Sequence, residues 1–200
     1  MKPGIVAAVL AVSLLLSACA GLPTQYASDL DWSDRVAQLN ALKTWRASGK
    51  LAIRTQEQSE SVNLQWQQDN HTTHIVLSGP LGIGATSIES DMQQLSVTRD
   101  GHTEHYDISS ARAARDAFGL DLPLQALPYW IMGLPAPGLQ SNNDPLIERG
   151  LLRRQEQLGW TITYESYGQF GHYTLPTRLK IERQSTRARL ILRNWSDFSS

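Results

Sequence analysis

Two pairs of histidines are the first candidates for chemistry in this sequence. His71 with His74 and His102 with His105 are each three residues apart, within segments whose apolar residues alternate. Positions i and i+3 of a strand point to opposite faces of a sheet, so neither pair forms a ready two-ligand clamp for a metal ion. Both pairs lie among polar residues near expected turns. The sequence therefore predicts solvated histidines and no metal site.

Glycines, serines and carboxylates form no catalytic pattern either. The glycines at positions 79, 82 and 84 do not have the spacing of a dinucleotide fingerprint, and no Lys-Ser or Lys-Thr pair follows them. The sequence contains no G-x-S-x-G nucleophile elbow. Asp144 and Glu148 could share one helical face, but they lie in or beside an expected loop. We therefore expect no enzyme activity and no cofactor.

The only cysteine, Cys19, lies at the end of an export signal. It follows Lys2 and an uncharged apolar run from Ile5 to Leu16, and the letters LSAC form an intact lipobox. A lipoprotein signal peptidase cuts before such a cysteine, whose sulfur then carries diacylglycerol. No second cysteine could form a disulfide with it. Ala18 and Ala20 around Cys19 also fit the small-x-small site of ordinary signal peptidase, which leaves that alternative open.

These features divide the chain into three parts. Residues 1–18 are predicted to be a removed lipoprotein signal peptide, residues 19–31 the lipidated cysteine and a flexible tether, and residues 32–200 a single domain. Without residues 1–18 the formal net charge is −2, since Lys2 is lost and all 19 acidic residues remain. With no basic tract we expect no nucleic-acid partner. Ala20, where an aspartate would retain a lipoprotein in the inner membrane, favours a lipid anchor in the outer membrane.

Period-two alternation of apolar and polar residues runs through most of the domain. The alternating segments are residues 45–54, 61–68, 74–78, 86–90, 94–101, 103–109, 148–157, 159–166, 177–183 and 187–195. Helical patterns cover 33–43 with Ser33 as the cap, 109–119 with Ser109 or Ser110 as the cap and Gly119 as the end, and 123–133 from Pro123 to Gly133. Pro128 interrupts the third helix or begins its last turn.

So many antiparallel strands with one apolar face each must curl or close. The fold class we expect is mainly β (α+β): an unclosed antiparallel β-barrel, or strongly curved sheet, with an apolar concave face and a short helical lid. Five tryptophans, at positions 45, 66, 130, 160 and 195, are placed to point inward. The sequence leaves open whether they fill a solid core or line an apolar cavity.

One turn carries apolar residues without an obvious core to join. Leu81 and Ile83 alternate with glycines in the stretch LSGPLGIG. The glycines let the chain turn tightly around Leu81, and a hairpin tip of small residues cannot bury that side chain well. The alternative is that Leu81 tucks under the lid or against a neighbouring strand.

Taken in order, the motifs from Trp32 to Trp195 resemble the LolB family of outer-membrane lipoprotein receptors. The segments that carry the resemblance are WRASGKLAIR with LQWQQ, GPLG at 79–82, LPLQALPYWIMGLP at 122–135, GWTITYESY at 159–167, LPTRLKI at 175–181 and RNW at 193–195, after the lipobox. The carrier LolA shares the fold but lacks a lipid-bearing cysteine, so Cys19 favours the receptor.

The resemblance implies a LolA/LolB-like fold and a role in lipoprotein sorting. Such a receptor accepts lipoproteins from the periplasmic carrier LolA and inserts them, without ATP, into the inner leaflet of the outer membrane. It would be a monomer anchored on the periplasm-facing side, with Leu81 and Ile83 in a loop that engages outer-membrane phospholipid. We expect the acyl-chain cavity to be lined by Leu51, Ile53, Val62, Leu64, Trp66, Leu127, Trp130, Ile131, Ile162, Leu179 and Leu190.

Three other functions remain possible from the sequence. The chain could be a lipid-binding envelope lipoprotein of the same fold that takes no part in sorting. It could be an envelope hydrolase with an unrecognised site, or a structural tether with a solid barrel. A hollow sheet with an apolar mouth would favour the lipid-binding functions over the last two.

Overall fold

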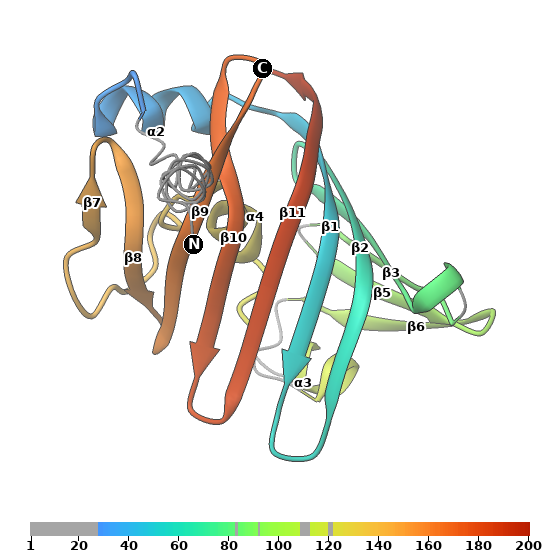
Figure 1. Ribbon diagram of the computed structural model, residues 1–200. Helices are drawn as coiled ribbons and strands as arrows, with labels where there is room; N and C mark the ends of the chain where they lie inside the picture. The colour runs from blue at the N-terminus through green and yellow to red at the C-terminus, as the bar shows by residue number, and fades with distance from the viewer. Residues whose placement is uncertain (1–27, 83, 92, 109–112, 120–121) are drawn as a thin grey trace, which may run out of the picture.

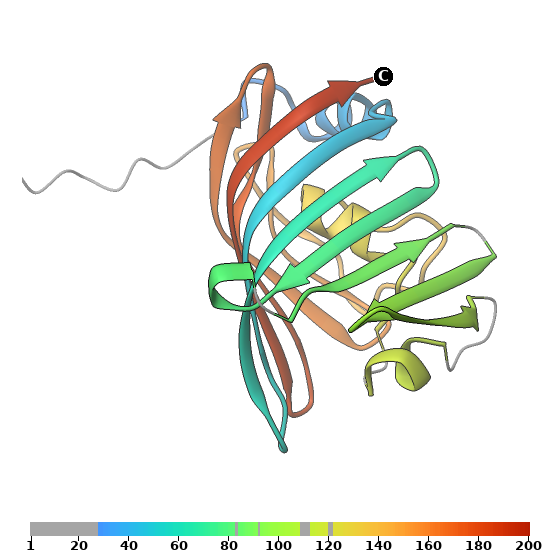
Figure 2. The same ribbon diagram turned by 90° about the vertical axis from the view of Figure 1, so that its right-hand side faces the viewer.

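Eleven antiparallel strands form one strongly curved sheet in the computed structural model (Figures 1 and 2). The structure describes residues 28–82, 84–91, 93–108, 113–119 and 122–200, with only the backbone of Leu81. The strands are β1 (Thr44–Arg54), β2 (Ser59–Asp69), β3 (Thr72–Ser78), β4 (Thr86–Ser90), β5 (Gln94–Arg99), β6 (His102–Asp107), β7 (Leu146–Glu148), β8 (Leu151–Gln157), β9 (Trp160–Phe170), β10 (Tyr173–Arg183) and β11 (Thr186–Ser199).

The strand order shows why the barrel stays open. It runs β6-β5-β4-β3-β2-β1-β11-β10-β9-β8-β7, so the first and last strands pair in the middle and β6 and β7 are the two edges. The sheet curls strongly, as expected for one with this many strands, without closing. The prediction of an unclosed antiparallel sheet is confirmed, and Figure 2 shows its concave side facing the helices.

The first helix of the domain, α2 (Trp32–Asn40), covers one end of the sheet. The sequence predicts Ser33 as the cap of this helix, but the cap is Asp31, whose carboxylate accepts a hydrogen bond of 2.9 Å from the Asp34 amide three positions on. Ser33 is the second residue of the helix. Leu39 is fully buried against the core.

The helix expected at 123–133 is shorter than the sequence suggested. Helix α4 spans Leu127–Met132, and Pro128 lies in its first turn and does not interrupt it. A proline costs nothing there, because the first-turn amides need no partner within the helix. Gly133 ends α4 as predicted, with φ of 81°. A Cβ at this position would lie 2.9 Å from the Tyr167 hydroxyl, so both backbone angle and space require glycine.

Other departures from the expected elements occur at the two edges of the sheet. The segment predicted as one strand at 148–157 contains a turn at Arg149 and Gly150, both with positive φ, so β7 and β8 form a hairpin. At the other edge, the alternation expected in β6 is absent, and only Tyr106 of β6 is not exposed. An edge strand has fewer neighbours to bury one face against. Strand β3 lies inside the sheet between β2 and β4 and also lacks the expected alternation, since it is half-buried along nearly its whole length.

The middle helical pattern gives α3 (Ala113–Phe118), which lies beside β6. Gly119, with φ of 69°, follows its last residue as predicted, while the expected caps at Ser109 and Ser110 lie outside the described residues. A short 3-10 turn, η1 (Pro80–Gly82), joins β3 to β4. Figure 1 shows α4 on the concave side of the sheet and α3 near its lower end.

Two hydrophobic clusters hold the molecule together. The main cluster lies between α4, α2 and strands β1, β2 and β8–β11, and contains all five inward tryptophans. Trp45 packs against Trp66 and Trp195, with ring centroids 5.7 Å and 5.2 Å apart. The second cluster is much smaller and joins Ile88, Leu95 and Val97 to Ala117 of α3. The prediction that the tryptophans point inward is confirmed.

Candidate functional site

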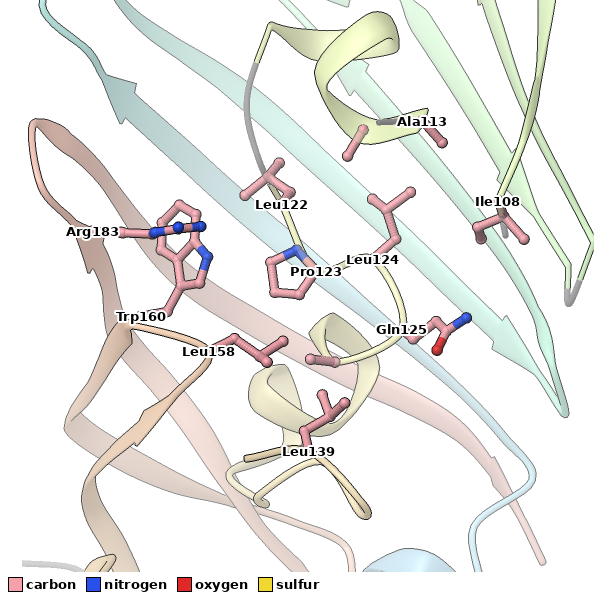
Figure 3. A pocket seen from close by; sticks show the side chains of 12 residues that line it. Ile108, Ala113, Leu122, Pro123, Leu124, Gln125, Leu139, Leu158, Trp160 and Arg183 are labelled. Atoms are coloured by element: carbon pink, nitrogen blue, oxygen red, sulfur yellow. The ribbon is translucent and has the colours of Figure 1, made fainter. Parts of the chain in front are cut away.

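An apolar pocket opens on the concave side of the sheet (Figure 3). It has a volume of about 320 Å³ and lies between α3, the segment before α4, and the β8–β9 turn. Its walls are Ile108, Ala113, Ala114, Leu122, Pro123, Leu124, Gln125, Ala126, Leu139, Leu158, Trp160 and Arg183. Ligand pockets are typically about 300–1,000 Å³, so this one is of a size for a small ligand or one end of a larger one.

One end of the pocket is polar. Trp160, the first residue of β9, is 2% exposed, and its Nε1 has no hydrogen-bond partner among the described residues. The guanidinium of Arg183, from the end of β10, lies over the Trp160 ring at 5.9 Å from its centroid. Figure 3 shows this stacked pair facing Leu122 and Pro123, with Ile108 and Ala113 at the opposite end. The remaining walls are almost entirely hydrocarbon.

The lip of the pocket is an exposed leucine in a strained turn. Leu158 is 39% exposed and has φ of 53°, a region that branched side chains seldom adopt. Its amide donates to the Gln140 carbonyl at 3.2 Å, which ties the β8–β9 turn to the long loop after α4. An apolar side chain that is both exposed and strained suggests a role at the surface.

Buried glutamines of β8 fix α4 to the sheet. Gln157 accepts a hydrogen bond from Trp130 Nε1 at 2.8 Å and from the Ala136 amide at 2.9 Å, and donates to the Ala136 carbonyl at 3.0 Å. Gln155 donates to the Leu134 carbonyl at 3.2 Å. Both glutamine side chains are buried, so these bonds have little competition from water.

Two tyrosines of β9 complete this polar layer. Tyr164 donates to the Trp130 carbonyl at 2.9 Å, and Tyr167 donates to the Leu152 carbonyl. Burial raises the pKa of Tyr164 well above its ordinary value, and burial likewise raises the pKa of Tyr167. Both phenols therefore stay protonated and act as donors throughout the physiological pH range.

Helix α2 buries a charged residue of its own. Arg35 is 1% exposed, its guanidinium carbon lies 5.5 Å from the centroid of the Tyr167 ring, and its Nε and Nη2 have no partner among the described residues. Burial lowers the pKa of Arg35 from its ordinary value, although an arginine remains charged at neutral pH. Arg153 approaches the same ring at 6.0 Å. The contact of Arg35 with the Tyr167 ring holds α2 against β9.

The residues predicted to line a cavity lie together on the concave side. Seven of the eleven are buried in the main cluster: Leu64, Trp66, Trp130, Ile131, Ile162, Leu179 and Leu190. Leu51 and Leu127 pack against it half-buried, and Ile53 and Val62 are half-buried on β1 and β2. The pocket of Figure 3 is lined by other residues, so the role of these eleven as an acyl-chain cavity stays a prediction.

The pocket residues were mostly missed by the sequence patterns. Trp160 is predicted to face inward, Ile108 to lie in the alternating segment 103–109 and Leu124 in the helix 123–133, but none of these patterns indicates a pocket. Leu122, Leu139 and Leu158 lie outside the predicted strands and helices. Loop side chains carry no alternation, so their convergence follows only from the packing of distant segments.

The remaining predicted positions are ordinary or lie outside the described residues. His74 pairs with Glu89 at 3.2 Å, and His105 bonds Ser96 at 2.9 Å, both at the surface. The described part of the chain contains no group of three His, Cys, Asp or Glu residues placed to hold a metal ion. Cys19 and Ile83 lie outside the described residues.

The η1 turn places the backbone of Leu81 in an exposed connection. Its neighbours Pro80 and Gly82 are exposed, and Asn63 on β2 donates to the Gly79 carbonyl at 3.2 Å. A Cβ added at Gly82 would meet nothing within 4 Å. Figure 2 shows the turn standing out from the side of the sheet that faces away from α4.

Comparison with known proteins identifies the family. Residues 43–195 match the family model described as outer membrane lipoprotein LolB. Curated proteins with the name outer-membrane lipoprotein LolB are 32% identical in Alkalilimnicola ehrlichii, over 92% of this chain and 92% of that one, and 34% identical in Pseudomonas aeruginosa, over 90% of each. The chain belongs to the LolB family. Membership places it at the outer membrane, in lipoprotein localisation.

A solved structure has a similar fold. A domain from Vibrio parahaemolyticus, described as an outer membrane lipoprotein-sorting protein, has a TM-score of 0.57 at 10% identity, over 84% of this chain and 90% of that one. At this identity the likeness concerns the fold alone. Within the described residues no helix is both long and apolar enough to cross a membrane.

Proposed function

We propose that this LolB-family chain accepts lipoproteins from the periplasmic carrier LolA and inserts them into the inner leaflet of the outer membrane without ATP. The observation that carries the proposal is the curved sheet with an apolar pocket already open on its concave side. The pocket borders the main cluster, because Trp160 lines the pocket and belongs to the cluster together with Ile162, two residues further on the same face of β9.

The cargo explains why a protein cavity is needed at all. Three acyl chains of about sixteen carbons would cost on the order of 40 kcal/mol to expose to water, at about 0.8 kcal/mol per methylene. Transfer must therefore run between apolar sites without a free state. The direction would follow from affinity that rises from carrier to receptor to membrane.

The eleven predicted residues would become the cavity lining when the core opens from the pocket inward. Helix α4 is fixed to β8 and β9 by the bonds of Gln157 and Tyr164. Among the described residues no hydrogen bond joins α4 to strands β3–β6. We therefore expect that β3–β6 with α3 move away from α4, and that α4 stays on the sheet.

Cys19 and the η1 turn would supply the two contacts with the membrane. Diacylglycerol on Cys19 anchors the chain after removal of residues 1–18, and Ser28 ties the end of the tether to the domain through a 3.1 Å bond to the Arg149 carbonyl. Leu81 and Ile83 on the exposed connection would enter the headgroup boundary and help the cargo leave.

Transfer from a loaded carrier tests the proposal. A chain that begins at residue 19 and carries Cys19→Ala should take a radiolabelled lipoprotein from purified LolA, and the lipidated chain in liposomes should pass it on to the bilayer without nucleotide. A chain that takes nothing from the loaded carrier would contradict the receptor function. Retention of other lipids alone would favour a lipid-binding lipoprotein outside the sorting pathway.

The Leu81→Glu variant separates delivery from acceptance. It should fold and accept cargo as the parent does, because the η1 turn is exposed, but deliver less to liposomes, since a carboxylate opposes entry into the apolar boundary. Pro80→Ala on the same turn is the matched control. An equal loss of acceptance and delivery in Leu81→Glu would place Leu81 in the core.

A further inference from the structure

The pocket of Figure 3 is chemically asymmetric, and its polar corner has no assigned role. We propose that the Trp160–Arg183 corner binds the ester carbonyl oxygen of an acylated glycerol, with the acyl chain lying along Leu122 and Leu124 toward Ile108. The inference rests on the proposed function and adds to it a recognition element for the glyceryl end of the cargo.

Trp160 supplies a donor that the folded protein leaves unused. Its Nε1 is buried and has no hydrogen-bond partner among the described residues. Three of the other four inward indoles have an acceptor within the protein: Trp66 donates to Gln68, Trp130 to Gln157 and Trp195 to the Pro176 carbonyl. A buried donor without an acceptor destabilises the protein, so a ligand oxygen that accepts from Trp160 Nε1 contributes more to the binding free energy than it would at an exposed donor.

Arg183 supplies a second donor beside the first. Its guanidinium lies over the Trp160 ring, and no carboxylate pairs with it in the described part of the chain. Arg187 on the same β10–β11 hairpin differs, since it pairs with Glu182 at 3.4 Å and is 68% exposed in its side chain. Stacking on the indole directs the Arg183 fork along the pocket wall and leaves its N–H groups for a ligand.

The residue types define the ligand. Trp160 and Arg183 are donors only, so the atom between them must be an acceptor. Apart from Gln125, the other walls are apolar, which excludes a sugar or peptide with many polar groups and favours a single carbonyl at the head of a hydrocarbon chain. A volume of about 320 Å³ suits one glyceryl ester with the first part of its chain, and not three full chains.

Paired lipopeptides with and without the ester carbonyl test the inference. The chain from residue 19 with Cys19→Ala would be titrated with a triacylated cysteinyl peptide, and with an analogue whose two glyceryl esters are replaced by ethers. The parent should bind the ester form about three- to tenfold more tightly, the factor expected for one buried hydrogen bond. Trp160→Phe and Arg183→Gln should lose that factor for the ester form only. Arg187→Gln is the matched control and should behave as the parent.

The outcomes separate this inference from the proposed function. If the parent binds ester and ether forms equally, or if Trp160→Phe weakens both equally, the ester contact is overturned while lipid binding stands. If the parent binds neither form, both the inference and the receptor function fail. A phospholipid with two ester-linked chains distinguishes the source of the ester: weaker binding than the lipopeptide supports the cargo, and binding that is tighter than the lipopeptide overturns it in favour of membrane lipid.

Discussion

The sheet has two halves that hold their helices in different ways. The first half, strands β1, β2 and β7–β11, carries α4, and the second half, strands β3–β6, carries α3. Helix α4 is fastened to β8 and β9 by buried glutamine and tyrosine side chains above a large cluster that includes five tryptophans. Helix α3 rests on β4 and β5 through a small cluster, and Arg99 donates a hydrogen bond of 2.9 Å to the Ala117 carbonyl. The helix of the first half lies over a large apolar cluster with a buried layer of directional bonds, whereas the helix of the second half covers a much smaller apolar cluster.

This difference indicates which half can move. Buried hydrogen-bond networks specify one arrangement, because each broken bond leaves an unpaired polar group. A small apolar cluster near a sheet edge can separate and re-form at lower cost, and regions of low stability supply the moving parts of proteins. The pocket lies where the two halves meet, with Trp160 from the first and Ala113 from the second.

The largest effect is expected from the same core substitution made in each half of the sheet. Leu179 on β10 and Leu95 on β5 are both 0% exposed. Leu179→Ala should lower the free energy of unfolding by about 4 kcal/mol and Leu95→Ala by about 2.5 kcal/mol, since the small cluster can collapse around the lost volume. Urea unfolding of both variants gives the values. Equal losses would show that the two halves are packed alike.

Removal of the Gln157 side-chain amide should cost nearly as much. Gln157→Leu leaves three buried partners unpaired, on Trp130 and Ala136, and we expect a loss of about 3 kcal/mol in the free energy of unfolding. Gln67→Leu, at an exposed position of β2, is the control and should change stability by less than about 0.5 kcal/mol. A small effect of Gln157→Leu would mean that apolar packing alone holds α4.

The β8–β9 turn should become more stable when its leucine is replaced. Leu158 and Gly159 both have positive φ, the geometry for which Asn-Gly is preferred. Leu158→Asn should therefore raise the free energy of unfolding by about 0.5–1 kcal/mol. The β5–β6 turn already has Asp100 before Gly101, so Asp100→Asn should have no comparable effect. A loss of stability in Leu158→Asn would assign its side chain a packing role.

The smallest expected effect is on the outer face of the first half. Glu165 of β9 pairs with Lys180 and Arg189, and the hydrogen bond from Lys180 is the main cause that lowers the pKa of Glu165 from its ordinary 4.5. A folded-state pKa below the unfolded value gives stability that is present above about pH 4.5 and is lost as the pH falls through the folded pKa.

Glu165→Gln should therefore cost about 0.5 kcal/mol at neutral pH, because the pair is partly exposed to solvent. The variant should also lose less stability on acidification than the parent. Unfolding curves at neutral and acidic pH, with and without 1 M salt, measure both effects. An identical acid response in variant and parent would contradict this account of Glu165.

The sequence by itself determined the repeated strands and their faces. Alternation in β1, β2, β9, β10 and β11 follows directly from residue type, because a strand buried on one side must place apolar residues at every second position. Gly119 and Gly133 marked the ends of helices correctly for a similar local reason, since few other residues tolerate positive φ. The ordered motifs were sufficient to place the chain in its family.

Only the tertiary structure decided where the pocket lies and which groups are left unpaired. Leu122, Leu139 and Leu158 meet there from separate loops, and no period in the sequence relates them. Trp160 and Trp130 are equivalent as letters, yet Gln157 satisfies one indole and nothing among the described residues satisfies the other. Whether a buried indole meets an acceptor depends on how close segments that are far apart in the chain come to each other. The curvature of the folded sheet sets that distance.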